Sequence, residues 1–238
     1  MANKRFSKGI VDGLPICIGY FSVAFAFGIF AVGGGLTSIQ ALLISMTNVT
    51  SAGQLAAVPI IASGGTLLEL MATQIVINLR YALMSISLSQ KFDSSITLPH
   101  RFAIAFVNTD EVFAVASAQK GSVNKPYMYG LILTPFLGWS LGTIIGAVAG
   151  DILPTIITNS LNIAIYGMFI AIVVPEFKIS RSVLFCVLIA IALSCIFYFV
   201  PMLSAVPSGF SIIICALISA AVMAIVAPIS IEEGVENV

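Results

Sequence analysis

The stretch FAIAFVNTDEVFAVASA, residues 102–118, is apolar enough to lie in a lipid bilayer except for two adjacent acids, Asp110 and Glu111. A second stretch, QIVINLRYALMSISLS at 74–89, carries Arg80 in the same kind of surroundings. A charge at the bilayer centre costs about 2.5–3.5 kcal/mol on insertion scales. We therefore expect these three side chains to face water, one another or a bound solute.

The composition of the whole chain indicates a membrane protein. Of its 238 residues, 59% are hydrophobic and 8% are charged, whereas soluble domains carry about 25% charged residues. We predict an all-α integral membrane protein that forms a single transmembrane domain over 1–238, with a short N-terminal tail (1–10) and a short acidic C-terminal tail (231–238). The formal net charge is zero, so no electrostatic argument favours a nucleic-acid partner.

Apolar windows long enough to cross a bilayer recur along the chain. They lie at about 13–33, 36–62, 66–89, 128–150, 161–175, 182–201 and 209–230. The stretch 102–119 is an eighth candidate, weakened by its charges. The pattern predicts a polytopic bundle of about seven to eight transmembrane helices.

The window 36–62 is interrupted by NVTSAGQ at 48–54 and by Pro59. Broken backbone is tolerated at membrane depth only where it lines a cavity or is packed in protein. Transporters use such breaks to hold substrate. We expect at least one discontinuous helix here, with a binding site at the break; the alternative is a merely kinked helix stabilised by its Thr and Ser side chains.

Loop charges favour one orientation of the chain. With eight crossings and the N-terminus inside, seven Lys and Arg residues lie inside and two, Lys91 and Arg101, lie outside. If 36–62 were instead a re-entrant hairpin, the count would be five against four. Basic residues concentrate on the cytoplasmic side, so we expect eight crossings with both termini cytoplasmic.

The segment 67–89 is polar on two opposite helical faces, which predicts a central position in the bundle. Arg80 then needs an acidic partner, and Asp110 or Glu111 is available. Burial and an acidic neighbour favour the protonated form of the second acid, which is the property of a proton carrier. The alternative is a structural ion pair with the second acid in an aqueous vestibule.

Glycine occupies every fourth position of GWSLGTIIGAVAG, at Gly138, Gly142, Gly146 and Gly150. This spacing gives a smooth helix face where another backbone packs closely. The partner helix belongs either to this chain or to another subunit.

No motif in the chain indicates a metal site, a cofactor or an enzyme. The four cysteines show no CxxC spacing, the one histidine (His100) stands in a polar connector, and no HExxH or P-loop pattern is present. We predict no bound metal, no cofactor and no catalytic residues.

Five stretches in order give a family resemblance. They are GLPICIGYFSVAFAFGIF (13–30), SAGQLAAV (51–58), INLRYALMSISLS (77–89), NTDEVFAVA (108–116) and GWSLGTIIGAVAGDILP (138–154). Together they resemble the AzlC family, the large subunit of bacterial branched-chain amino-acid exporters. The resemblance runs from about residue 9 to 230.

The resemblance implies export of hydrophobic amino acids, such as leucine, isoleucine, valine and methionine, across the bacterial inner membrane. It also implies a small four-helix membrane subunit of the AzlD type, and energy from an ion or substrate gradient. The chain departs from the family pattern in two places: Tyr81 follows Arg80 where many members have histidine, and SAGQ stands where many read GAAQ. The missing histidine moves attention to Asp110 and Glu111.

An amino-acid zwitterion needs a donor for its carboxylate and an acceptor for its ammonium. Arg80 matches carboxylate geometry, and Asp110 or Glu111 is expected to meet the ammonium or carry a coupled proton. We predict a substrate site formed by Asn78, Arg80, Gly53, Gln54 and Asn108. Two alternatives stay open: an uncoupled channel or pore, and a structural membrane subunit whose glycine face docks the active component.

Overall fold

The computed structural model describes residues 2–154, 156, 160, 163, 167, 170, 173–178, 180–203 and 205–228. Its helices are α1 (Ala2–Gly33), α2 (Ser38–Thr47), α3 (Ser51–Ala62), α4 (Leu67–Ser89), α5 (Leu98–Phe106), α6 (Asp110–Ser117), α7 (Lys125–Ile152), α9 (Arg181–Phe199) and α10 (Ser208–Val226). Within the described residues, five helices are long and apolar enough to cross a membrane: α1, α4, α7, α9 and α10. The predicted all-α polytopic class is confirmed. The predicted span at 161–175 lies mostly, and the acidic tail 231–238 entirely, outside the described residues.

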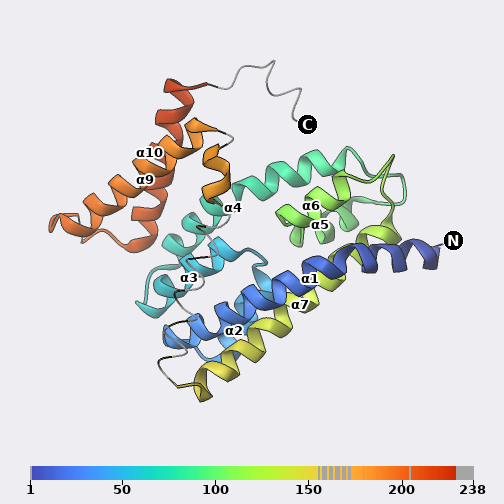
Figure 1. Ribbon diagram of the computed structural model, residues 1–238, viewed down its shortest axis with the longest axis horizontal. Coiled ribbons are helices and arrows are strands. Elements are labelled where there is room, and N and C mark those ends of the chain that lie inside the picture. The colour runs from blue at the N-terminus through green and yellow to red at the C-terminus, as the bar shows by residue number, and fades with distance from the viewer. Residues whose placement is uncertain are drawn as a thin grey trace.

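The two longest helices, α1 and α7, run parallel and side by side (Figure 1). Their backbones touch: a Cβ atom added to Gly146 would lie 2.0 Å from the carbonyl oxygen of Phe25, and one added to Gly28 would lie 2.3 Å from that of Thr143. Gly138 and Gly142 meet α1 in the same way. The glycine face of α7 thus packs against a helix of the same chain.

The break predicted in 36–62 is a reversal of the chain. Helices α2 and α3 have 10 and 12 residues, so each is about 15–18 Å long against a hydrocarbon core of about 30 Å. The Gln54 amide donates to Ser45 Oγ across the break (2.6 Å). Farther along α3, Val58 packs against Gly34, which lies just before α2. We call residues 38–62 hairpin 1: it enters and returns at one end of the molecule, so the segment does not make the single crossing that was expected.

The stretch 102–119, predicted as a weak eighth span, also consists of half-length helices. Helix α5 ends at Phe106, and α6 starts at Asp110 after a turn at 107–109. Arg101 near the start of α5 stacks over the ring of Phe92 (5.7 Å to its centroid), and the Lys91 ammonium donates to the carbonyl of Ser117 at the end of α6. Both ends of this segment therefore lie beside the end of α4. We call residues 98–117 hairpin 2.

The two hairpins enter from opposite ends of the bundle. Hairpin 1 follows α1 and begins where α1 ends, whereas α4 runs back toward the start of α1 and is followed by hairpin 2. That return is fixed by Gln119, just after α6, which accepts a hydrogen bond from Lys8 of α1 (2.7 Å). A long helix followed by a hairpin thus occurs twice in opposite directions, an order that resembles the inverted-topology repeats of secondary transporters. No repeat is visible in the sequence itself.

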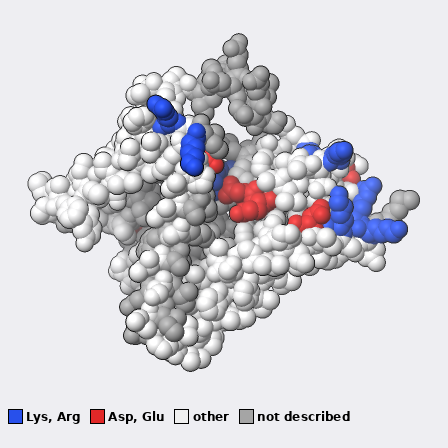
Figure 2. All heavy atoms as spheres, viewed as in Figure 1, with Lys and Arg blue, Asp and Glu red and all other residues white. Residues whose placement is uncertain are grey.

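With both segments folded as hairpins, the basic residues gather at one end of the bundle. The end that holds the start of α1 carries Lys4, Arg5, Lys8, Lys91, Arg101, Lys120 and Lys125. Figure 2 shows basic side chains crowded around that end. Lys178 and Arg181 lie next to the start of α9, which is beside the end of α10.

The start of α10 lies at the opposite end, against α4. There the backbone N–H of Gly209 donates to the buried carboxylate of Glu69 (2.8 Å). Because α9 and α10 are antiparallel, Lys178 and Arg181 lie away from the end that holds Glu69. Arg80 lies near the middle of α4, away from both of these ends.

Candidate functional site

The tips of the two hairpins meet beside the middle of α4 and line an open cavity of about 190 Å³, which we call the central cavity. It is lined by Thr47, Asn48, Val49 and Thr50 of the first tip, Asn78 and Tyr81 of α4, and Ala105, Phe106 and Asn108 of the second. Both chain reversals thus contribute to a single cavity, which fits the rule that irregular backbone at membrane depth lines a cavity or is packed in protein.

Gln74 of α4 ties the tip of hairpin 1 in place. Its side-chain oxygen accepts hydrogen bonds from the amides of Asn48 (2.8 Å) and Asn78 (3.1 Å), and its own amide donates to the carbonyl of Gly53 (2.9 Å). Gly53 has no room for a side chain, because an added Cβ would lie 2.4 Å from Thr50 Oγ1. The predicted site residues Gly53 and Asn78 therefore belong to one network, and its centre is Gln74.

Gln54 lies away from the central cavity. Its fully buried side chain donates to Ser45 Oγ, which is 2.6 Å from Thr143 Oγ1 of α7. This chain of hydrogen bonds joins hairpin 1 to the α1–α7 pair. The structure thus gives Gln54 a place in the wall behind the site, where it holds the hairpin.

Arg80 pairs with Asp110, the first residue of α6, at 2.8 Å. The guanidinium also donates to Tyr81 Oη (3.2 Å) and stacks on that ring. A carboxylate in the first turn of a helix is further stabilised by the helix dipole. Both partners are substantially exposed, 61% and 44%, and Figure 2 shows acidic side chains at the middle of this face. The ion pair therefore joins α4 to the tip of hairpin 2 on an open face of the molecule.

Glu111, the neighbour of Asp110, has a neutral partner. Its carboxylate accepts a short hydrogen bond from the hydroxyl of Tyr20 on α1, and no cation of the described residues forms a salt bridge with it. Tyr20 is held in turn by Trp139 of α7, with ring centroids 4.9 Å apart in an edge-on arrangement. Glu111 is thus the acid left over once Arg80 is paired. No charge or polarity pattern around Tyr20 in the sequence signals this contact.

Asn108 stands at the tip of hairpin 2 and is 2% exposed. Its amide nitrogen donates to Ser85 Oγ of α4 (3.0 Å). Its side-chain oxygen, like that of Asn78, is buried without a hydrogen-bond partner in the described part of the chain. A buried acceptor left unpaired is costly, so the central cavity offers two amide oxygens to a donor such as an ammonium group.

Helix ends add a second kind of polarity to the cavity. Helices α3 and α6 begin at the two tips, after Thr50 and Thr109, and α2 and α5 end there. Helix N-termini favour negative charge and C-termini favour positive charge, and discontinuous helices hold carboxylates in transporters in this way. The arrangement therefore suits a small zwitterion. Among the described residues, no group of three or more His, Cys, Asp or Glu side chains is placed to bind a metal.

Paired re-entrant hairpins around a polar cavity define a polytopic membrane protein of the kind that includes carriers and channels. The family described as AzlC protein matches residues 15–153, and the chain belongs to it. The matched region contains both hairpins, all of α4 and α7, and most of α1. The features that form the central cavity are thus those of the family region.

Two relatives are similar over much of the chain. An uncharacterized membrane protein of Archaeoglobus fulgidus is 33% identical over 178 residues, which is 74% of this chain and 78% of the relative. The inner membrane protein YgaZ of Escherichia coli is 31% identical over 153 residues, 63% of this chain and 62% of the relative. No solved structure matches.

Proposed function

We propose that this protein is a secondary carrier that exports hydrophobic amino acids, the branched-chain ones above all, across the bacterial inner membrane. The observation that supports this most directly is the central cavity, which lies between two hairpins that enter from opposite ends of an inverted repeat. Such a site is reached from each side by moving one hairpin, which is the requirement for alternating access. The AzlC family, known for branched-chain amino-acid transport, supplies the substrate class.

The polar groups of the cavity match the ammonium and carboxylate groups that all amino acids share. In this proposal the amide oxygens of Asn78 and Asn108 accept from the ammonium, and the N-termini of α3 and α6 attract the carboxylate. Arg80 acts through Asp110, by holding hairpin 2 closed. Glu111 carries the coupled proton, because of the two acids Asp110 and Glu111 it is the one that forms no salt bridge with the described residues.

The distribution of basic residues supports a cytoplasmic N-terminus. With both hairpins re-entrant, the nine Lys and Arg residues outside the middle of α4 fall on one side. The positive-inside rule places that side in the cytoplasm. Hairpin 1 is then the outer gate and hairpin 2 the inner gate.

Cysteine labelling tests this topology. In a background free of the four native cysteines, Ser38→Cys and Ser63→Cys should both react with a membrane-impermeant maleimide from outside. Ser94→Cys and Ser122→Cys should react only after the cytoplasmic face is exposed. If Ser38→Cys and Ser63→Cys were labelled from opposite sides, the segment would cross the membrane and hairpin 1 would not exist.

The family resemblance adds a partner to the proposal, a small membrane subunit of the AzlD type. The direct test of function uses the purified chain, with and without that subunit, in liposomes loaded with labelled leucine. We expect leucine to move against its own concentration gradient when a proton gradient is imposed. Liposomes that contain either protein alone should show no such movement. If leucine moved only down its concentration gradient in every condition, the result would count against a coupled carrier.

A passive channel is the second candidate, because paired half-helices also line channel pores. It predicts downhill flux of leucine at channel rates with no response to an imposed gradient of protons. The third reading, a structural subunit that docks through its glycine face, loses its main support, since that face is covered by α1.

A further inference from the structure

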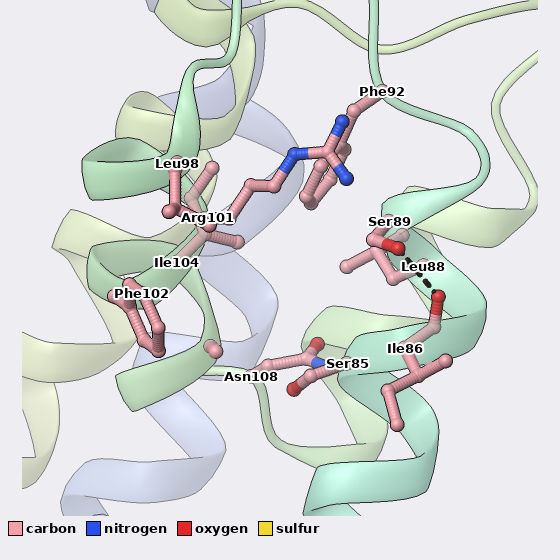
Figure 3. Close-up of a pocket in the computed structure, with 11 residues that line it drawn as sticks. Ser85, Ile86, Leu88, Ser89, Phe92, Leu98, Arg101, Phe102, Ile104 and Asn108 are labelled. Atoms are coloured by element: carbon pink, nitrogen blue, oxygen red, sulfur yellow. Dashed lines mark hydrogen bonds between the residues drawn. The ribbon is translucent and has the colours of Figure 1, made fainter.

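A second cavity lies beside the central one, between the last two turns of α4 and helix α5. It has a volume of about 180 Å³, and we call it the α4–α5 groove. Figure 3 shows apolar side chains on both of its walls. They are Ile86 and Leu88 from α4, and Leu98, Phe102 and Ile104 from α5.

The groove is polar only at its ends. At one end the Arg101 guanidinium reaches across from α5 and stacks on the ring of Phe92 (Figure 3; 5.7 Å to the centroid). No carboxylate in the described part of the chain pairs with Arg101. At the other end lies Asn108, bonded to Ser85 and with its buried side-chain oxygen unpartnered.

The groove and the central cavity share residues. Ala105 and Asn108 line both of them. The groove lies on the basic-residue side of hairpin 2, which the proposed orientation places toward the cytoplasm. The groove and the central cavity therefore adjoin at Asn108.

We propose that the α4–α5 groove is a cytoplasmic-side binding site for short aliphatic carboxylates, which delivers leucine-like substrates to the central cavity. The carboxylate binds Arg101, which is free of an acidic partner and matches its geometry. The aliphatic side chain lies along the apolar walls. The lining contains no acid, so the groove selects for the carboxylate and the side chain, and the ammonium is recognised only later, at Asn78 and Asn108. This site rests on the proposed function for its physiological substrate.

Because the groove recognises the carboxylate and the side chain but not the ammonium, we expect an unusual order of affinities among leucine analogues. The affinities are measured by competition against the equilibrium binding of labelled leucine to the purified full chain. The 2-oxo acid of leucine should compete within a few fold of leucine itself, and leucinol, which lacks the carboxylate, should compete at least tenfold more weakly. Affinity should rise about fourfold per methylene from alanine to norleucine. Equal competition by leucinol and leucine would overturn the proposal.

Two variants, each with a matched control, test whether leucine binds in the α4–α5 groove. Arg101→Gln should weaken leucine binding about tenfold, because it removes a charge-assisted contact, whereas Lys120→Gln, at the same end of the molecule, should not. Ser89→Phe, which fills the groove, should abolish the dependence on chain length. Ser87→Phe, on the same helix but outside the groove lining, should leave it intact.

The same variants in everted membrane vesicles separate this proposal from the exporter proposal. If wild-type vesicles do not accumulate leucine but the purified protein shows the expected order of affinities, the groove proposal is supported and the exporter proposal is contradicted. Suppose instead that wild-type vesicles accumulate leucine, and that Arg101→Gln and Ser89→Phe both leave the half-saturating concentration of leucine unchanged. The groove proposal is then contradicted and the exporter proposal is supported. Loss of a co-purified lipid in Ser89→Phe with unchanged leucine binding would show a lipid groove and would also overturn the proposal.

Discussion

Glu111→Gln is expected to abolish export against a gradient while leaving leucine exchange at near wild-type rates. Glu111 is the acid of the central site without a cation partner; its carboxylate is held by the neutral hydroxyl of Tyr20. Glutamine keeps the shape and accepts the same hydrogen bond through its amide oxygen, but it takes up no proton. Coupled cycles should therefore fall at least a hundredfold, a size typical of removing an essential proton-transfer group, while substrate binding and exchange continue.

The measurement compares two assays on the same proteoliposomes: leucine accumulation driven by a pH gradient, and counterflow of labelled against unlabelled leucine. The variant's counterflow should also lose its dependence on pH. Tyr20→Phe is the companion variant, since it removes the donor and keeps the acid. It should retain accumulation with an altered pH profile. Normal accumulation by Glu111→Gln would exclude Glu111 as the coupling group.

Asp110→Asn provides the contrast within the same helix turn. Asp110 is paired with Arg80 at 2.8 Å, and loss of one partner of an ion pair at membrane depth leaves the other uncompensated. We expect accumulation and counterflow to fall together in this variant, and to recover in part when Arg80→Gln is added. The two acids, adjacent in sequence, are thus distinguished by which assay each one affects.

The sequence predicted the charges of the site better than the path of the chain around them. The cost of placing Arg80 or Asp110 in lipid is a property of a few residues, and it is visible without a structure. Whether a broken apolar segment continues or turns back depends on distant contacts, such as Val58 against Gly34 or Lys91 against Ser117. Hydropathy sums do not contain those contacts, so hairpin 1 was expected to cross and hairpin 2 was counted as a weak span.

The same limit applies at single residues. Gln54 stands in a broken, polar stretch, and its neighbour Gly53 does belong to the cavity network, but a helical position one residue on turns the side chain toward Ser45. Tyr20 lies on an apolar helix whose local pattern is that of any lipid-facing segment. Its partner, Glu111, is 91 residues away, so only the packing of α1 against hairpin 2 reveals the contact.

Gly28→Ala is expected to destabilise the protein strongly. The added Cβ would lie 2.3 Å from the carbonyl oxygen of Thr143 and 2.5 Å from the backbone nitrogen of Ala147. Both obstacles are backbone atoms, so no rotamer change relieves the overlap and the two helices must separate. Overpacking of this kind costs about 1–3 kcal/mol, and separation also disturbs the Tyr20–Trp139 contact that holds Glu111. We expect Tm in detergent to fall by roughly 5–10 °C, with loss of coupled export.

Gly19→Ala is the matched control, because it adds the same methyl group to the same helix at a position with no other atom within 4 Å. It should leave Tm unchanged or raise it slightly, since alanine is the better helix former by about 0.5–1 kcal/mol. On α7, Gly146→Ala should resemble Gly28→Ala, with its Cβ 2.0 Å from the Phe25 carbonyl oxygen, and Gly150→Ala, at 3.3 Å from Ile29, should be mild. If Gly28→Ala and Gly19→Ala melted at the same temperature, the close backbone contact of α1 and α7 would be wrong. The glycine face would then be free for another subunit, as the structural-subunit reading requires.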